Sequence, residues 1–375
     1  MTKREISEIK RLFKKGDNSF TRLCGCYVHG EERISETFCQ AFQSLPEEDA
    51  NKYLDIFKKT LSGGINKNLF SLTFPNEKSA NDCRSSLEKI VNSELKDENI
   101  LETFYQRVIE LYDTMEDYVI LIIHNRYDVP GKGLDGIDME DASEDVYSYI
   151  VCAVCPVKLS EPGLGYRTKE NDFASLERDR VIEMPEFGFL YPSFNERSTD
   201  LWETLYYSAN AKALNKSFIE DFLYAGMPIA APQQMESFCS IVDEVFEQQT
   251  DYQTVCAIKD SMDEYVAQKE SDGARPEDCV LEPKDLKDLI EKASGKEIDD
   301  QTYSKVVKEI MPENGKLFGE NLTNPKIFEL KTSSAVVRVN TELTSKPEIR
   351  KIDGRNCIVV PIEGELKANG MIVKP

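Results

Sequence analysis

Two segments near the middle of the chain carry apolar residues at both odd and even positions. They run from Tyr118 to Tyr127 and from Val146 to Val157. A strand that is apolar on both faces has to be covered on both faces. This pattern therefore predicts two adjacent central strands of one sheet, with helices packed against it. The segment from Val181 to Phe194 is expected to extend this sheet, and Pro185 and Pro192 favour an edge or a bend there.

Apolar positions recur at helical spacing on either side of these strands. Before them, helices are expected at 34–61, with a break at Pro46, and at 80–91 and 98–112. After them, apolar residues at 235–246 and 255–266 have the same period and predict a helical hairpin.

The last part of the chain has the signals of short antiparallel strands. Asp353-Gly354 and Asn369-Gly370 are dipeptides that favour two-residue hairpin turns. Together with strand-like runs at 327–330 and 335–339, they predict a small antiparallel C-terminal sheet.

These elements predict an α+β fold with an N-terminal α/β unit around a mixed central sheet, a helical middle and the small C-terminal sheet. A chain of 375 residues exceeds the usual size of one domain. We expect an N-terminal domain at 1–228, a helical hairpin at 229–270, a linker at 271–282 and a C-terminal helix-plus-β domain at 283–375.

The charge of the chain is unevenly distributed. The formal net charge is −22, which argues against a general binder of nucleic-acid backbones. From residue 326 onward, however, nine Lys or Arg stand against six Asp or Glu, a local net charge of +3. A contact with DNA or another anion is therefore expected only through the C-terminal domain. The candidate residues for it are Arg338, Arg350, Lys351 and Arg355.

Cysteine usage and hydropathy indicate a cytoplasmic protein without a membrane segment. The longest apolar run, Tyr118 to Ile123, is too short to cross a bilayer. The ten cysteines are expected to be thiols in a reducing compartment, and the Cys152-x-x-Cys155 pair has no partner pair for a zinc site. No cofactor is predicted.

One segment could carry metal chemistry. His124 and Asp128 end the first central strand, as a candidate general base and a candidate ligand. The acidic connection that follows contains Asp135, Asp138 and Asp141, whose carboxylates are ligands that hard divalent cations prefer. The alternative is that His124 is a hydrogen-bonded structural residue and that the acidic run is a solvated loop.

A polar run follows the third strand-like segment. It consists of Asn195, Arg197, Ser198, Thr199 and Asp200. The spacing of Asp200 and Glu203 is similar to that of an acidic capping box, so this run is expected to form a turn and a helix cap. Arg197 is expected to pair with a carboxylate of the acidic connection, which would make the run a structural polar centre.

Four segments resemble a bacterial protein family of unknown function, DUF4317-like, over essentially the whole chain. They are Thr21 to Val28 (TRLCGCYV), Val129 to Gly133 (VPGKG), Val151 to Ser160 (VCAVCPVKLS) and Glu183 to Asp200 (EMPEFGFLYPSFNERSTD). This resemblance implies no activity, cofactor or catalytic residue. The order of elements also resembles that of bacterial nucleoid-associated proteins, which implies association with the nucleoid.

Two functions remain open at this point. The first is a non-enzymatic interaction protein, possible partners being proteins and, through the C-terminal domain, the nucleoid. The second is a metal-dependent hydrolase or nuclease that uses the acidic segment 124–145. The sequence leaves the oligomeric state open.

Overall fold

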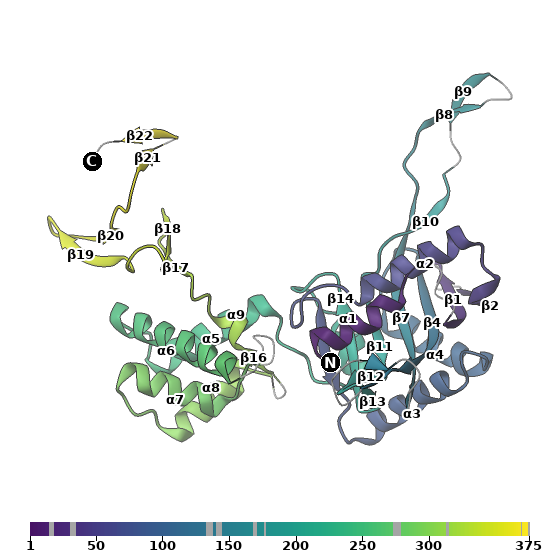
Figure 1. Ribbon diagram of the computed structural model, residues 1–375, viewed down its shortest axis with the longest axis horizontal. Coiled ribbons are helices and arrows are strands. Elements are labelled where there is room, and N and C mark those ends of the chain that lie inside the picture. Colours follow the sequence, from purple (N-terminus) through teal and green to yellow (C-terminus); the bar gives the residue numbers. More distant parts are fainter. Residues whose placement is uncertain are drawn as a thin grey trace. The chain divides into compact units, whose positions relative to one another are not determined.

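The centre of the molecule's large sheet is formed by β4 (Tyr118–Val129) and β7 (Asp145–Leu159), which pair along their full shared length (Figure 1). A computed structural model describes residues 1–14, 19–30, 35–132, 138–139, 145–167, 171–175, 178–272, 279–312, 315–368 and 370–373. Contacts divide the chain into two compact units. The first contains residues 1–231 and 312–315, and the second contains residues 232–311 and 316–375.

The large sheet has eight strands. Its order is β2 (Ser35–Ala41), β1 (Phe20–Val28), β4, β7, β11 (Phe187–Tyr191), β14 (Glu203–Ser208) and β3 (Leu69–Thr73), and β10 (Arg180–Ile182) also pairs with β7. Neighbouring strands are antiparallel throughout. The α+β class and the adjacency of the two central strands are thus confirmed, whereas the sheet is antiparallel where the sequence predicts a mixed one.

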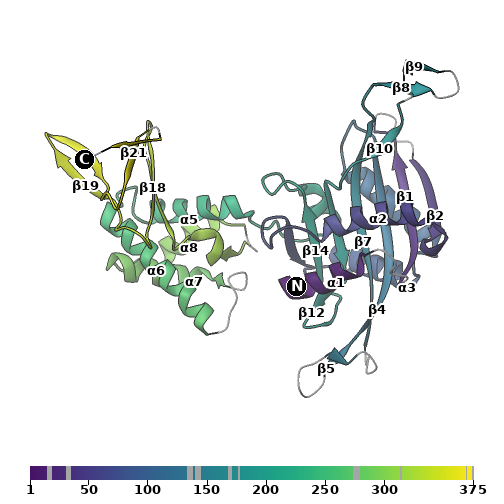
Figure 2. The same ribbon diagram turned by 45° about the horizontal axis from the view of Figure 1, so that its top comes forward.

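Helices cover both faces of this sheet, as the double-sided apolar pattern predicts (Figure 2). They are α1 (Lys3–Leu12), α2 (Glu47–Thr60), α3 (Lys78–Asn92) and α4 (Glu98–Leu111), with the short turns η1 (Phe42–Ser44) and η2 (Phe218–Phe222). Leu121 and Ile123 pack in one core with α1 and α2. Ile120 and Ile122 pack in the other core with α3, α4 and η2. The alternation of side chains along β4 therefore separates two apolar cores.

The prediction that a helix begins at residue 34 is wrong. Residues Ser35–Ala41 form β2, and α2 begins only after Pro46. Exposed and half-exposed residues make up most of β2, because it is an edge strand that covers little of either core. Its sequence accordingly lacks an apolar pattern that would distinguish a strand from the start of a helix.

Three small hairpins extend from the sheet strands. They are β5 (Gly131–Lys132) with β6 (Asp138–Met139), β8 (Leu164–Arg167) with β9 (Asp172–Ser175), and β12 (Ser193–Asn195) with β13 (Ser198–Asp200). The pair β8 and β9 stands beyond the end of the sheet (Figure 1).

The second unit combines helices with small two-stranded sheets. Its helices are α5 (Ala231–Val245), α6 (Tyr252–Ser271), α7 (Pro283–Ser294), α8 (Asp300–Ile310) and α9 (Gly319–Leu322), and β15 (Val280–Leu281) pairs with β16 (Leu317–Phe318). The two helices expected at 235–246 and 255–266 are present as α5 and α6, and α6 packs mainly against α7. The four-part division expected from the sequence stays a prediction about which segments fold independently.

The end of the chain forms three further hairpins. They are β17 (Ile327–Lys331) with β18 (Val336–Asn340), β19 (Glu348–Ile352) with β20 (Arg355–Val359), and β21 (Leu366–Ala368) with β22 (Met371–Val373). The Asp353-Gly354 turn has positive φ at both residues, 48° and 78°, as a type I′ turn requires. Instead of the single C-terminal sheet that the sequence predicts, the structure has three separate pairs of strands.

Candidate functional site

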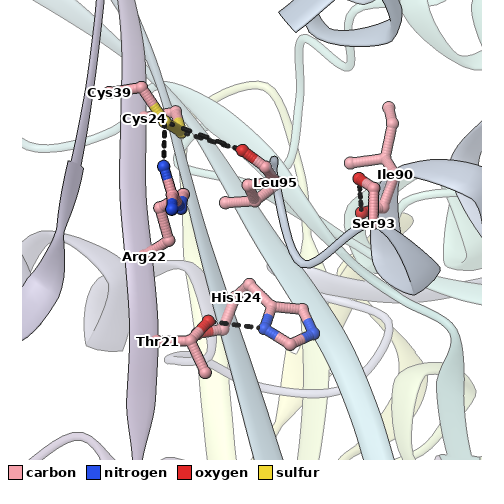
Figure 3. Close-up of a disulfide and its surroundings, with 8 residues drawn as sticks. All are labelled: Thr21, Arg22, Cys24, Cys39, Ile90, Ser93, Leu95 and His124. Carbon is pink, nitrogen blue, oxygen red and sulfur yellow. Dashed lines mark hydrogen bonds between the residues drawn. A yellow bond between two sulfur atoms is a disulfide. The ribbon is translucent and has the colours of Figure 1, made fainter. Parts of the chain in front are cut away.

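His124 is completely buried on β4 and both of its ring nitrogens have hydrogen-bonding partners. Nδ1 lies 2.7 Å from the Thr21 hydroxyl, and Nε2 lies 2.9 Å from the Ser148 hydroxyl (Figure 3 shows the first of these contacts). Burial lowers the pKa of His124 to about 4, so the ring is neutral at pH 7. A neutral, enclosed imidazole that links three neighbouring segments has the properties of a structural residue.

Asp128, the candidate ligand, does not lie beside His124. Asp128 is exposed. It lies four residues further along β4, which separates the two Cα atoms by about 13 Å. Asp135 and Asp141 lie outside the described residues, as does the side chain of Asp138, whose backbone forms part of β6. Within the described ranges, no group of three or more His, Cys, Asp or Glu side chains could hold a metal ion.

The polar run at 195–200 forms a hairpin, so the predicted turn is present and the predicted helix cap is wrong. Asn195 pairs with Ser198 across the turn, and Thr199 and Asp200 continue β13. A strand, β14, follows where the cap would need a helix. The two turn residues, Glu196 and Arg197, have φ of 52° and 60°. This left-handed conformation normally favours Gly or Asn, and the sequence therefore lacks the usual signal for the turn.

Arg197 connects this hairpin to two other elements. Its guanidinium lies 3.2 Å from a carboxylate oxygen of Glu8 on α1 and donates to the Pro130 carbonyl at 3.0 Å. Asn195 donates to Asp200 at 2.8 Å and to Glu203 at 3.2 Å. Arg197 thus connects the hairpin to α1 and to the residue after β4, whereas Ser198 and Thr199 are exposed. Of the carboxylates at 135–145 that were expected to face Arg197, only that of Asp145 lies within the described side chains.

A polar pocket of about 710 Å³ lies between this hairpin and the start of α1. Its lining includes four carboxylates, those of Glu5, Glu196, Asp200 and Glu203, beside the Trp202 ring. Several of these groups already have partners within the fold. Glu5 closes the capping box of α1, and Asp200 accepts from the Trp202 backbone N–H at 2.9 Å. The Met1 ammonium lies 3.0 Å from Glu203. Glu203, which also accepts a hydrogen bond from Asn195, therefore connects the N-terminus to the hairpin.

The thiols predicted throughout the chain are present with one exception. Cys24 on β1 is directly opposite Cys39 on β2, and their sulfur atoms form a disulfide (Figure 3). Arg22 and the Leu95 carbonyl lie beside the sulfurs. The sequence does not reveal this pair because it depends on the strand register between β1 and β2, and β2 is the strand whose residues read as helix.

The Cys152-x-x-Cys155 pair has no reactive arrangement. Residues three apart on a strand point to opposite faces, and Cys152 and Cys155 accordingly lie in different cores. Burial raises the pKa of each thiol well above its ordinary value. Both cysteines are therefore core residues.

The four basic residues proposed for anion contact do not share one free surface. Arg338 pairs with Glu329 in one hairpin, and Arg350 pairs with Glu348 in the next. The register of β19 and β20 places Arg350 opposite Cys357 and Lys351 opposite Asn356, so these two basic side chains lie on opposite faces. Arg355 lies on the face of Arg350.

A family model described as "Domain of unknown function (DUF4317)" matches residues 1–371. The chain belongs to this family. The resemblance seen in the sequence is thereby confirmed across the whole chain of this DUF4317 protein. No curated protein matches it. In the described part of the DUF4317 chain, no helix has the length and apolar character needed to cross a membrane.

Proposed function

We propose that this DUF4317 protein is a non-enzymatic interaction protein of the cytoplasm, which binds a partner protein through its C-terminal hairpins. The observation that carries the proposal is the exposure of apolar side chains on three separate two-stranded sheets. The exposed apolar residues on these hairpins are Ile327, Val336, Ile349, Ile352, Met371, Ile372 and Val373.

Such hairpins are incomplete as stable structures. A two-stranded hairpin is only marginally stable in water, and three or more strands with a covered apolar face are needed for independent stability. Each outer strand also presents unpaired backbone N–H and C=O groups to which another strand can add. A partner that adds a strand would satisfy both needs at once.

The surroundings of His124 support a non-enzymatic role. A general base must reach the proton that it abstracts. His124 is enclosed and its ring nitrogens contact Thr21 and Ser148. The alternative is a metal-dependent hydrolase or nuclease that uses the acidic segment 124–145. A rise in melting temperature on addition of Mg²⁺, Mn²⁺ or Zn²⁺ would favour that alternative.

Association with the nucleoid is the second form of the interaction proposal. The local net charge of +3 from residue 326 onward supports nucleoid association. The pairing of Arg338 and Arg350 with carboxylates opposes it. If the hairpins contact phosphates, binding of the full chain to duplex DNA should weaken steeply between 50 and 200 mM salt. If the chain does not bind DNA, or if its DNA binding is insensitive to salt, nucleoid association is contradicted and binding of a partner protein is favoured.

The main experiment compares partner capture by three forms of the full chain. Ile349→Lys/Ile372→Lys places charges on two exposed hairpin positions. The matched control, Val181→Lys/Met184→Lys, makes the same change at exposed positions of the first unit. We expect recurrent partners, identified by mass spectrometry, to be lost from the hairpin variant and kept by the control. Partners retained equally by both would contradict the proposal.

A further inference from the structure

The strand β19 has a free edge and a fixed starting point. In the part of the chain that the structure describes, β19 pairs with β20 alone. The residue before it, Pro347, accepts a hydrogen bond from the Tyr252 hydroxyl of α6. Beyond this anchor, every residue of β19 is exposed. The hairpin is thus attached at its base, while the free edge and both faces of β19 are open.

We propose that the missing third strand is β19 of a second copy of this chain. This inference rests on the proposed interaction function and names its partner. Two copies of β19 would pair antiparallel across a two-fold axis at Ile349. The product is a four-stranded sheet in the order β20, β19, β19 and β20, which reaches the number of strands that an exposed hairpin lacks.

The charges along β19 favour this register over one centred on Arg350 or Lys351. A two-fold axis perpendicular to a sheet keeps each side chain on its own face of the sheet. Residues that lie directly opposite each other share a face, so the axis must lie between one residue and the same residue of the second copy. An axis at Arg350 or Lys351 would place two like charges directly opposite each other, which is destabilising. An axis at Ile349 places Glu348 opposite Arg350 of the second copy, and Arg350 opposite the second Glu348. The sequence Glu348-Ile349-Arg350 is therefore complementary to itself.

The same register aligns the apolar residues. Ile349 is opposite Ile358 within the hairpin. With the axis at Ile349, one face of the four-stranded sheet carries a continuous row of four isoleucines, two from each copy. Ile349 is 49% exposed in the single chain, so the row would cover apolar surface that is now open to water.

The neighbouring hairpins are weaker candidates for self-pairing, because one already has a buried apolar residue and the other has an outer strand without charges. Phe328 of β17 is already buried, and its ring lies 6.2 Å from that of Tyr252 on α6. The strand β22 consists of Met371, Ile372 and Val373, which offer no charges to choose a register. The other strand of this hairpin, β20, could also pair with its own copy. With the axis at Cys357, Arg355 would lie opposite Val359, so this pairing would form no opposite-charge pair.

Charge reversal tests the pairing directly. Wild type, Glu348→Arg, Arg350→Glu and the exchanged double variant would be compared as full chains by sedimentation velocity over a range of concentrations. Each single variant places like charges opposite each other twice, and should raise the dissociation constant of the dimer about tenfold. The double variant restores both pairs and should dimerise as wild type does. Glu329→Arg, in the adjacent hairpin, is the matched control and should leave the dimer unchanged.

Mixing the two single variants separates this interface from the ion pair within each hairpin. In the mixed dimer, Arg at 348 and 350 of one copy would face Glu at 350 and 348 of the other. We expect the mixture to regain the wild-type dissociation constant, although each chain still lacks its internal pair. A mixture as weak as its components would overturn the proposal, as would a dimer insensitive to either single variant.

A wild-type chain that stays monomeric would also overturn it. The partner-capture experiment then decides about the broader proposal, because Ile349→Lys/Ile372→Lys would still lose partners if the hairpins bind a different protein. If wild type stays monomeric and the hairpin variant also keeps its partners, both the dimer and the broader interaction proposal are contradicted.

Discussion

The large sheet and the C-terminal hairpins are both antiparallel, but they differ in what covers them. The central strands of the sheet are buried on two faces between α1 and α2 on one side and α3 and α4 on the other. The strand β19 is exposed at all of its positions. Similar apolar residues thus stabilise the fold in one region and remain available for contacts in the other. Matched substitutions in the two regions test this difference by their effect on stability.

The largest difference should come from removing an isoleucine. Ile122 is completely buried in the sheet, and Ile122→Ala should lower the free energy of unfolding by about 4 kcal/mol because it leaves a cavity. Ile349→Ala, measured on the monomer, should change it by no more than about 0.5 kcal/mol. Urea denaturation of both variants provides the comparison. Similar losses would show that the hairpin is an integral part of the fold.

The buried histidine should make the sheet unit sensitive to acid. Its pKa is about 4 in the folded protein against 6.5 in the unfolded chain, so only the unfolded state takes up the proton between these values. Stability should therefore fall as the pH falls from 6.5 to 4, and His124 should account for about 3 kcal/mol of that loss.

The matched variant is His124→Gln, which keeps hydrogen-bonding groups and does not titrate. Unfolding free energies at pH 7 and pH 4.5 should differ less for His124→Gln than for wild type. An equal pH dependence in both proteins would contradict the neutral, enclosed state of His124.

The disulfide should also contribute to the sheet unit. It closes a loop with a sequence separation of 15, so its reduction should cost about 3 kcal/mol of stability. Denaturation with and without reductant measures this cost. Thiol labelling of the denatured chain without reductant should modify eight of the ten cysteines, and labelling of all ten would contradict the bond.

The smallest effect should come from single ion pairs. Arg197 is largely enclosed between Glu8 and Pro130, and Arg197→Ala should destabilise the protein by about 1 kcal/mol. Arg338→Ala removes an exposed pair with Glu329 and should cost less than about 0.5 kcal/mol. Thermal unfolding of both variants tests the order, and a larger loss for Arg338→Ala would reverse it.

The residues that sequence patterns could place are those whose environment follows from local periodicity. Tyr118 to Ile123 is apolar on both faces, which required a central strand with cover on each side. Asp353-Gly354 similarly specified its turn. The strand Ser35–Ala41 lies at the edge of the sheet, where little burial is needed and no apolar pattern develops. Glu196 and Arg197 form their turn without the residues that normally favour positive φ.

The candidate site was predictable only in part, because its contacts join distant segments. The burial of His124 could be anticipated from the apolar strand before it, but its partners Thr21 and Ser148 come from two other strands. The pairing of Cys24 with Cys39 required the register of a strand that local periodicity does not reveal. Likewise, the contact of Arg197 with Glu8 joins residues at opposite ends of the first unit's sequence.

The order of strands has a consequence for how the chain folds. Only 15 residues separate the end of β4 from the start of β7 in the sequence, so these two strands can meet early. In contrast, Thr73 of β3 must find Glu203 of β14, about 130 residues later. Closing so long a loop is entropically costly until other contacts have shortened it. We expect the central ribbon to nucleate the fold and β3 to dock late, so that a nascent chain exposes the β14 edge until assembly is complete.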